Sequence, residues 1–168
     1  MAEAASREII HRLMQIPKPT IRDVNMAKMQ VSQALNLQSL LPNSTLIRHL
    51  KPDEKKLLRI LLRKRVRTIS GVTIVAVMTK PYPCPKTAPC AYCPGGPSMG
   101  VPQSYTGFEP AAMRGIQNRY DPYRQVRSRI RQLESIGHNV DKVELVIMGG
   151  TFPATPLQYQ TRFVQRCI

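Results

Sequence analysis

The sequence predicts an α/β protein in which a helical N-terminal region precedes a βαβ unit with a parallel sheet. Residues 72–78 form a short, unbroken apolar run rich in β-branched residues, the pattern of a buried parallel strand, and residues 143–148, VELVIM, are predicted to be the second strand. A helical pattern over residues 121–136 provides the crossover that parallel strands require. Because two strands cannot close a (β/α) barrel, which needs roughly 200 residues or more, we expect the 168-residue chain to be the front part of a larger protein.

The first two predicted helices have recognisable boundaries. Apolar residues at helical spacing predict a helix over residues 2–15, which Pro17 and Pro19 end. Thr20 and Asp23 have the spacing of a capping box, so we expect Thr20 to begin a second helix. The apolar side chains of that helix are Val24, Ala27, Met29, Val31, Ala34 and Leu35.

The rest of the N-terminal region is predicted to be a connector followed by a third helix. We expect residues 43–50 to be the connector, and residues 52–54, a proline and two acidic residues, to form the first turn of the helix. That helix ends in a basic run at residues 63–67. Its expected inward side chains are Leu57, Leu58, Leu61 and Leu62. The predicted domains are thus a basic helical region, residues 1–67, and the start of a second domain, residues 68–168.

The second domain has further elements around its two strands. We expect the first strand to be fully buried, and residues 107–120 to contain a short helix. Asp121 and Pro122 form an N-cap and first-position pair for the crossover helix, and Gly137 stands where a C-cap glycine is expected. One more helix is predicted to begin at residues 155–156.

The charge balance indicates a polyanionic partner. Lysine and arginine number 25 against 10 acidic residues, for a net charge of +15, an excess that favours binding to nucleic acid. Charge alone does not separate this hypothesis from a helical region whose cations are merely solvated. The candidate RNA contacts are Arg63, Lys64, Arg65 and Arg67 in the basic run, and Arg124, Arg127, Arg129 and Arg131 on the outward face of the crossover helix.

The compartment is predicted to be the cytoplasm. No apolar run approaches the ~20 residues that span a bilayer, and the first residues lack the pattern of a secretory signal. A reducing compartment disfavours disulfides, so the cysteines need another explanation.

Three of the four cysteines lie within ten positions of one another, in the loop after the first strand. Cys84, Cys90 and Cys93 have the spacing C-x5-C-x2-C between prolines, and Cys167 is far away in a predicted helix. A structural zinc site usually takes four closed ligands in two pairs, whereas three thiolates are sufficient to hold an iron–sulfur cluster with one iron open to substrate. Inert structural thiols would be more scattered. The spacing therefore favours a cluster and leaves zinc open.

Long phrases of this sequence resemble the radical S-adenosylmethionine domain of the Elongator catalytic subunit family, whose archaeal form is a tRNA carboxymethyluridine synthase. They are VAVMTKPYPCPKTAPCAYCPGGP, SYTGFEPAAMR and DPYRQVRSRIRQLESIGHNVDKVELVIMGGTFPA, and the resemblance covers most of residues 63–168. The helical front end resembles the family's RNA-contacting region. The resemblance implies a partial (β/α) barrel and an enzyme that uses acetyl-CoA and S-adenosylmethionine to modify C5 of the wobble uridine in tRNA.

The resemblance also implies roles for particular residues. Cys84, Cys90 and Cys93 would hold a [4Fe–4S] cluster, with Tyr92 beside it. Two further sites would bind organic cofactors: Gly149 and Gly150 would contact S-adenosylmethionine, and Lys142 would contact acetyl-CoA.

The sequence departs from the family pattern in three respects. The first cysteine gap is five residues, Thr151 stands where many radical enzymes have an acid, and the C-terminal acetyltransferase domain is absent from the chain. We therefore expect the chain alone to be inactive. The alternatives are another radical S-adenosylmethionine enzyme and a non-enzymatic, zinc-containing RNA-binding module. The expected partner is tRNA, and a homodimer or Elongator-like subunits stay open.

Overall fold

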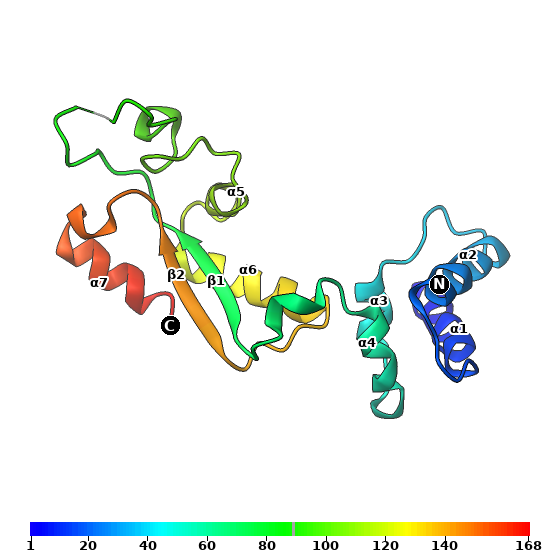
Figure 1. Ribbon diagram of the computed structural model, residues 1–168. Coiled ribbons are helices and arrows are strands. Elements are labelled where there is room, and N and C mark those ends of the chain that lie inside the picture. The colour runs from blue at the N-terminus through cyan, green and yellow to red at the C-terminus, as the bar shows by residue number, and fades with distance from the viewer. Residues whose placement is uncertain (89) are drawn as a thin grey trace. The chain divides into compact units, whose positions relative to one another are not determined.

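The computed structural model describes residues 1–88 and 90–168, without the side chains of Arg65 and Arg67. Figure 1 shows the elements in chain order. A helical region precedes a parallel βαβ unit, which confirms the predicted α/β class. The chain divides into two compact units, each built from two stretches: residues 1–71 with 132–140, and residues 72–131 with 141–168.

The first unit is helical. The two predicted N-terminal helices are confirmed, and in α1 the side chains of Ile9, Ile10 and Leu13 are fully buried. The capping box is also confirmed, because the Thr20 amide donates to the Asp23 carboxylate at 2.7 Å and the Asp23 amide donates to the Thr20 hydroxyl at 3.4 Å. The α-helices of this unit are α1 (Ala2–Met14), α2 (Ile21–Ala34), α3 (Asn43–Arg48) and α4 (Leu58–Leu61), and its 3₁₀ helices are Pro52–Leu57 and Arg65–Thr68.

Two predictions for this unit are wrong. The expected connector at residues 43–50 contains α3, whose Leu46 is fully buried, so packing outweighs the poor helix propensity of its first residues. The expected third helix is instead a 3₁₀ helix, Pro52–Leu57, followed by the four-residue α4, and it ends before the basic run because Leu62 is extended and Lys64 is left-handed with φ of +56°. Leu57 and Leu61 are buried as expected, whereas Leu58 and Leu62 are only half-buried.

The second unit contains the predicted parallel strands, β1 (Thr73–Met78) and β2 (Val143–Met148). They pair in register along their whole length, from Thr73 opposite Val143 to Met78 opposite Met148. Because the strands are parallel, both carboxyl ends lie at one edge of the sheet. The loop after β1, which carries the three cysteines, and the turn after β2 therefore leave the sheet side by side.

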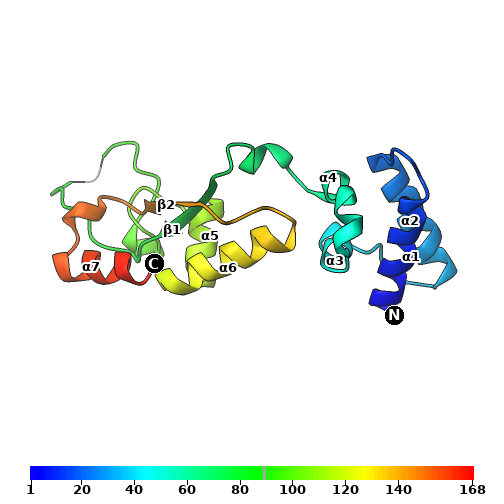
Figure 2. The ribbon, with the colours of Figure 1, turned by 90° about the horizontal axis from the view of Figure 1, so that it is seen from below.

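Helices cover one face of the strand pair. Val77 of β1 packs with Leu145 and Ile147 of β2, with Val126 of α6 (Pro122–Ser135) and with Phe163 of α7 (Leu157–Gln165). Figure 2 shows α6 and α7 on the same side of the strands. At the carboxyl edge, Met78 packs against α5 (Pro110–Gln117), the predicted short helix.

Full burial of the first strand is a wrong prediction. Ile74 points to the face opposite Val75 and Val77, and it is 55% exposed. The apolar run indicated a strand correctly, but it does not show that both faces of the strand are covered by other elements.

The crossover helix has the predicted caps. The Asp121 carboxylate accepts a hydrogen bond from the Arg124 amide at 2.8 Å, which makes Asp121 the N-cap. Gly137 has φ of +90°, and the Gly137 and His138 amides donate to the Glu134 and Leu133 carbonyls at 2.9 and 3.0 Å. These bonds form a Schellman motif, which glycine favours because the position is left-handed.

No helix in the described part of the chain is long and apolar enough to cross a membrane.

Candidate cofactor site at the sheet edge

The carboxyl edge of the sheet is held together beyond the strands. The Thr79 amide donates to the Met148 carbonyl at 2.8 Å, and the Thr79 hydroxyl donates to the Gly149 carbonyl at 3.2 Å. Gly149 has φ of +127°, and a Cβ atom there would fall on the Thr79 hydroxyl. Gly149 is therefore required both by its backbone conformation and by the close approach of the neighbouring strand.

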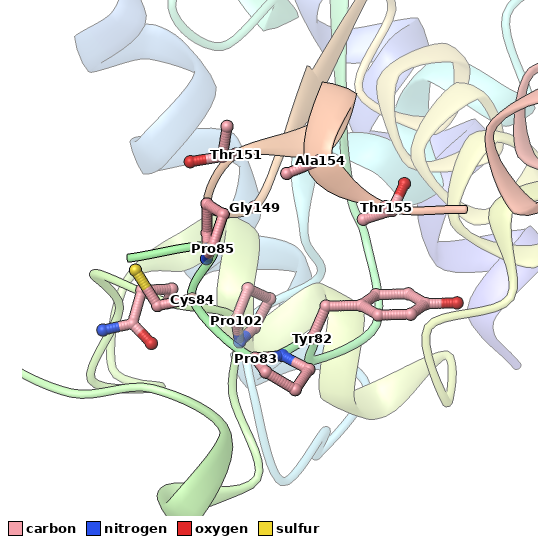
Figure 3. Close-up of a pocket in the computed structure, with 11 residues that line it drawn as sticks. Tyr82, Pro83, Cys84, Pro85, Pro102, Gly149, Thr151, Ala154 and Thr155 are labelled. Carbon is pink, nitrogen blue, oxygen red and sulfur yellow. The ribbon is translucent and has the colours of Figure 1, made fainter. Parts of the chain in front are cut away.

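A first pocket, of about 210 Å³, lies at this edge and is called here the strand-end pocket. Gly149, Gly150 and Thr151 line it from the turn after β2, and Tyr82 and Cys84 line it from the loop after β1. Figure 3 shows Tyr82 and Cys84 on opposite sides of the pocket, with Thr151 and Gly149 above them in that view. The pocket joins the predicted glycine pair to the first of the three cysteines.

A second cavity, of about 400 Å³, is lined by all three cysteines and is called here the cysteine cavity. Cys84, Cys90 and Cys93 are each half-buried and free, and Gly150 and Thr151 line the same cavity. The structure thus brings together four of the predicted cofactor residues, although they follow two strand ends, Met78 and Met148, that are 70 residues apart in sequence.

Hydrogen-bond donors surround two of the thiols. The Gln103 side-chain amide donates to the Cys93 sulfur at 2.8 Å, and the Lys86 ammonium lies 3.1 Å from the Cys90 sulfur. Hydrogen bonding, first from the Ser104 hydroxyl, lowers the pKa of the Cys93 thiol. Donors of this kind stabilise the thiolate, which is the form that binds metals.

The cysteine cavity offers three thiols as possible ligands of a metal centre. Among the described residues, no three His, Cys, Asp or Glu side chains meet at a point that could hold a single ion. A tetrahedral zinc ion gathers its ligands around one atom, whereas the three cysteines of a [4Fe–4S] cluster bind three different irons. Three thiols that line one cavity are the residues that would hold such a group.

Comparison with known proteins identifies the family. Residues 2–69 match the model of the ELP3 N-terminal domain. The chain is 55% identical over 130 residues to a tRNA uridine(34) acetyltransferase of Methanocaldococcus infernus, which covers 75% of this chain and 24% of the relative. It is 42% identical over 173 residues to Elongator complex protein 3 of Schizosaccharomyces pombe, an alignment that covers 97% of this chain and 32% of the relative. It is 43% identical over 151 residues to Elongator complex protein 3 of Homo sapiens, an alignment that covers 85% of this chain and 28% of the relative.

The chain belongs to the Elongator catalytic subunit family. It spans about a quarter to a third of the length of these relatives. The resemblance of its sequence to this family is thereby confirmed, and residues 2–69 correspond to the N-terminal domain of the family.

Two residues that the family resemblance singles out do not line the cysteine cavity. Tyr92 is 87% exposed and does not line the pockets described above. Lys142 precedes β2 and is exposed, and its carbonyl accepts a hydrogen bond from the Thr73 amide at 2.8 Å. Lys142 is thus at the amino edge of the sheet, about 20 Å from the carboxyl edge at ~3.3 Å per strand residue.

The predicted RNA contacts fall into two groups, one in each unit. Arg63 and Lys64 are exposed after α4, and the side chains of Arg65 and Arg67 lie outside the described residues. The second group is on α6, where Arg124 and Arg127 are exposed and the Arg127 guanidinium lies 5.8 Å from the centre of the Tyr123 ring. On the same helix, Arg131 is exposed as predicted, whereas Arg129 is half-buried.

Cys167 is separate from the other thiols, as expected. It follows α7, which ends at Gln165, so its predicted place inside a helix is wrong by two residues. It packs with Val77 and Phe163, and burial raises the pKa of its thiol to about 11. A thiol with so high a pKa in an apolar cluster is a packing group.

The polar groups that contact the cysteines could not be predicted from the sequence pattern. Gln103 and Ser104 contact Cys93 from a turn in which the Ser104 amide donates to the Gly95 carbonyl at 3.1 Å. Their separation of about ten residues from the cysteine follows no periodic pattern. Lys86, in contrast, is four residues from Cys90, and a lysine between two cysteines is a signal that could have been used.

Proposed function

We propose that this chain provides the cofactor site and part of the tRNA-binding surface of an enzyme that modifies uridine 34, the wobble position, of tRNA. The observation that carries the proposal is the single cavity shared by Cys84, Cys90, Cys93 and Gly150 at the carboxyl edge of a parallel sheet. Loops at this edge are where α/β enzymes place their chemistry. The similarity to the Methanocaldococcus infernus protein, a tRNA uridine(34) acetyltransferase, supports uridine 34 as the position that is modified.

In this proposal the three cysteines hold a [4Fe–4S] cluster, and Gly149 and Gly150 bind S-adenosylmethionine in the adjoining strand-end pocket. The bound cluster would supply the electron that splits S-adenosylmethionine, the chemistry of a radical enzyme. The Gln103 side-chain amide and the Lys86 ammonium contact the Cys93 and Cys90 sulfurs and so help to position them, and Gly149 and Gly150 line the pocket beside Cys84. The βαβ unit is then the beginning of a partial (β/α) barrel.

The proposed product is a carboxymethyl group at C5 of uridine 34, with acetyl-CoA as the carbon source. Lys142 is the proposed contact for acetyl-CoA, through a phosphate or the thioester carbonyl. Since Lys142 lies at the amino edge of the sheet, Lys142→Ala in a full-length relative should weaken acetyl-CoA binding and leave iron–sulfur absorbance unchanged. We expect the chain alone to be inactive and to bind acetyl-CoA feebly, and tight Lys142-dependent binding in calorimetry would contradict this.

Anaerobic reconstitution of the chain with iron and sulfide tests the cofactor site. Serine variants of Cys84, Cys90 or Cys93 should each lose iron–sulfur absorbance, because each thiolate binds one iron. Cys167→Ser is the matched control, and it should retain the absorbance of the unmodified chain.

Metal analysis of the same preparations distinguishes the proposed iron–sulfur enzyme from the rival zinc-containing module. A brown protein with iron and sulfide supports the proposal. One stoichiometric zinc ion that requires Cys167 would refute it and favour a zinc-containing RNA-binding module.

A further inference from the structure

A third pocket in the second unit is lined by four cationic side chains and is called here the cationic pocket. Its volume is about 390 Å³, and the cations are Lys80, Arg119, Arg162 and Arg166. Lys80 follows β1 by two residues, so the pocket reaches the carboxyl edge of the sheet. None of these four residues belongs to the RNA contacts expected from the sequence.

The charges of this pocket are not balanced within the described part of the chain. Asp121 is its one acidic lining residue, and that carboxylate is already engaged by the Arg124 amide at 2.8 Å and the Arg166 guanidinium at 3.1 Å. Arg119 and Arg162 are exposed and have no ion-pair partner among the described residues. Two unpaired guanidinium groups around one concavity create a positive potential that attracts an anion.

The backbone that carries Arg119 is strained and firmly held. Arg119 and Tyr120 are consecutive non-glycine residues in the left-handed region, with φ of +53° and +54°, a conformation that costs about 1–2 kcal/mol per residue. The Tyr120 amide donates to the Gly115 carbonyl at 2.7 Å, and the Tyr120 hydroxyl donates to the Gly100 carbonyl at 2.9 Å. These bonds offset the strain and fix the loop at the pocket wall.

Aromatic side chains separate the cationic pocket from the strand-end pocket. Tyr159 lines the first and Tyr82 lines the second, and their ring centres are 4.9 Å apart. The Lys80 ammonium lies 4.9 Å from the centre of the Tyr82 ring and 5.0 Å from that of the Tyr159 ring, a cation–π arrangement that holds it in place. The cationic pocket therefore adjoins the pocket that contains Cys84.

We propose that the cationic pocket binds a phosphodiester group of an RNA strand. Arginine presents a planar fork that matches phosphate oxygens, and both Arg119 and Arg162 are free to use it. The whole chain has a net charge of +15, and this positive charge favours binding of a polyanion such as RNA. The identity of the RNA as tRNA rests on the proposed function. The pocket would anchor the backbone beside the candidate cofactor site.

Affinity for tRNA tests the proposal first. Arg119→Gln/Arg162→Gln should weaken binding roughly tenfold at low salt, and the slope of log affinity against log salt should fall by about 0.7–0.9, the contribution of the one phosphate that the pocket would neutralise. Arg22→Gln/Arg59→Gln removes the same charge from two exposed sites in the first unit and should have a much smaller effect. Equal losses in the two variants would overturn the proposal, because the effect would then be diffuse.

Arginine modification by phenylglyoxal, followed by peptide mass spectrometry, tests the site directly in the unmodified chain. Saturating tRNA should protect Arg119 and Arg162 at least severalfold, leave Arg22 reactive, and protect far better than inorganic phosphate at the same phosphate concentration. Protection by inorganic phosphate but not by tRNA would indicate a small-anion pocket and overturn the proposal, as would no protection by either.

The two proposals can fail separately. A chain that binds zinc in place of a cluster, yet shows tRNA protection of Arg119 and Arg162, would refute the proposed enzyme and retain the phosphate pocket. A chain that assembles the cluster but shows no tRNA protection of Arg119 and Arg162 would retain the proposed enzyme and refute the phosphate pocket.

Discussion

Replacing Glu54 with glutamine is expected to destabilise the helical unit by about 1–2 kcal/mol at neutral pH. Glu54 is 5% exposed, and its carboxylate accepts hydrogen bonds from two Arg7 nitrogens at 2.6 and 2.7 Å. The Lys51 amide donates to it at 2.8 Å, and Arg7 also donates to the His49 carbonyl at 3.0 Å. One carboxylate thus joins α1 to the 3₁₀ helix Pro52–Leu57.

The magnitude follows from the pKa of Glu54. The hydrogen bond from Arg7 is the main cause that lowers this pKa from 4.5 to about 2. A shift of that size corresponds to about 3 kcal/mol of folding free energy at neutral pH. Because the Arg7 side chain is 33% exposed, solvent screens the pair, and about 1–2 kcal/mol is a realistic share.

The pH dependence has a definite sign. A carboxyl group whose pKa is lower in the folded state stabilises the fold at every pH above its unfolded pKa. This stabilisation should therefore be complete above about pH 5 and should disappear as the pH falls towards about 2. The difference between the unmodified chain and Glu54→Gln should shrink over the same interval.

Urea titration with hydrogen–deuterium exchange of peptides from α1 measures this difference locally. Asp53→Asn, at the exposed neighbouring position, is the control and should cost little. A Glu54→Gln effect that is the same at pH 7 and pH 2.5 would refute the electrostatic explanation, as would an equal effect of Asp53→Asn.

Two further predictions concern the second unit. Gln125 is 2% exposed, and its side-chain amide accepts a hydrogen bond from the Met78 amide and donates one to the Met78 carbonyl, both at 2.8 Å. Gln125→Leu should therefore lower the free energy of unfolding by about 1–3 kcal/mol, because these buried backbone groups lose their partner. Thermal unfolding measures the loss. Gly149→Ala should cost more than about 3 kcal/mol, because the methyl group meets Thr79, whereas Gly100→Ala, also at positive φ but with nothing within 4 Å of the new Cβ, should cost only about 1–2 kcal/mol. Similar urea midpoints for the two alanine variants would contradict the predicted clash.

Most elements of the second unit could be predicted because their signals are local. The strands β1 and β2 were found from apolar runs, and Asp121 and Gly137 marked the ends of the crossover helix through short-range hydrogen bonds. The parallel pairing then followed from the crossover itself.

Other features depended on contacts between distant residues. The helix α3 forms although its sequence begins with Asn43, Ser44 and Thr45, because burial of Leu46 compensates for weak propensity. Exposure of Ile74 is likewise decided by which face the helices cover, and no local pattern records that choice.

The sequence by itself determined the family and the three cysteines that are candidates for a cofactor, because both are carried by residue identity and close spacing along the chain. Only the tertiary structure decided that Gly150 joins those cysteines at one cavity and that Lys142 lies at the other edge of the sheet. The predictable parallel pairing brings both carboxyl ends to one edge and both amino ends to the other, but which side chains of the two strand-end loops meet there depends on how the loops fold against each other. The cationic pocket arises in the same way, because Lys80, Arg119 and Arg162 come from three separate segments that meet only when the chain folds.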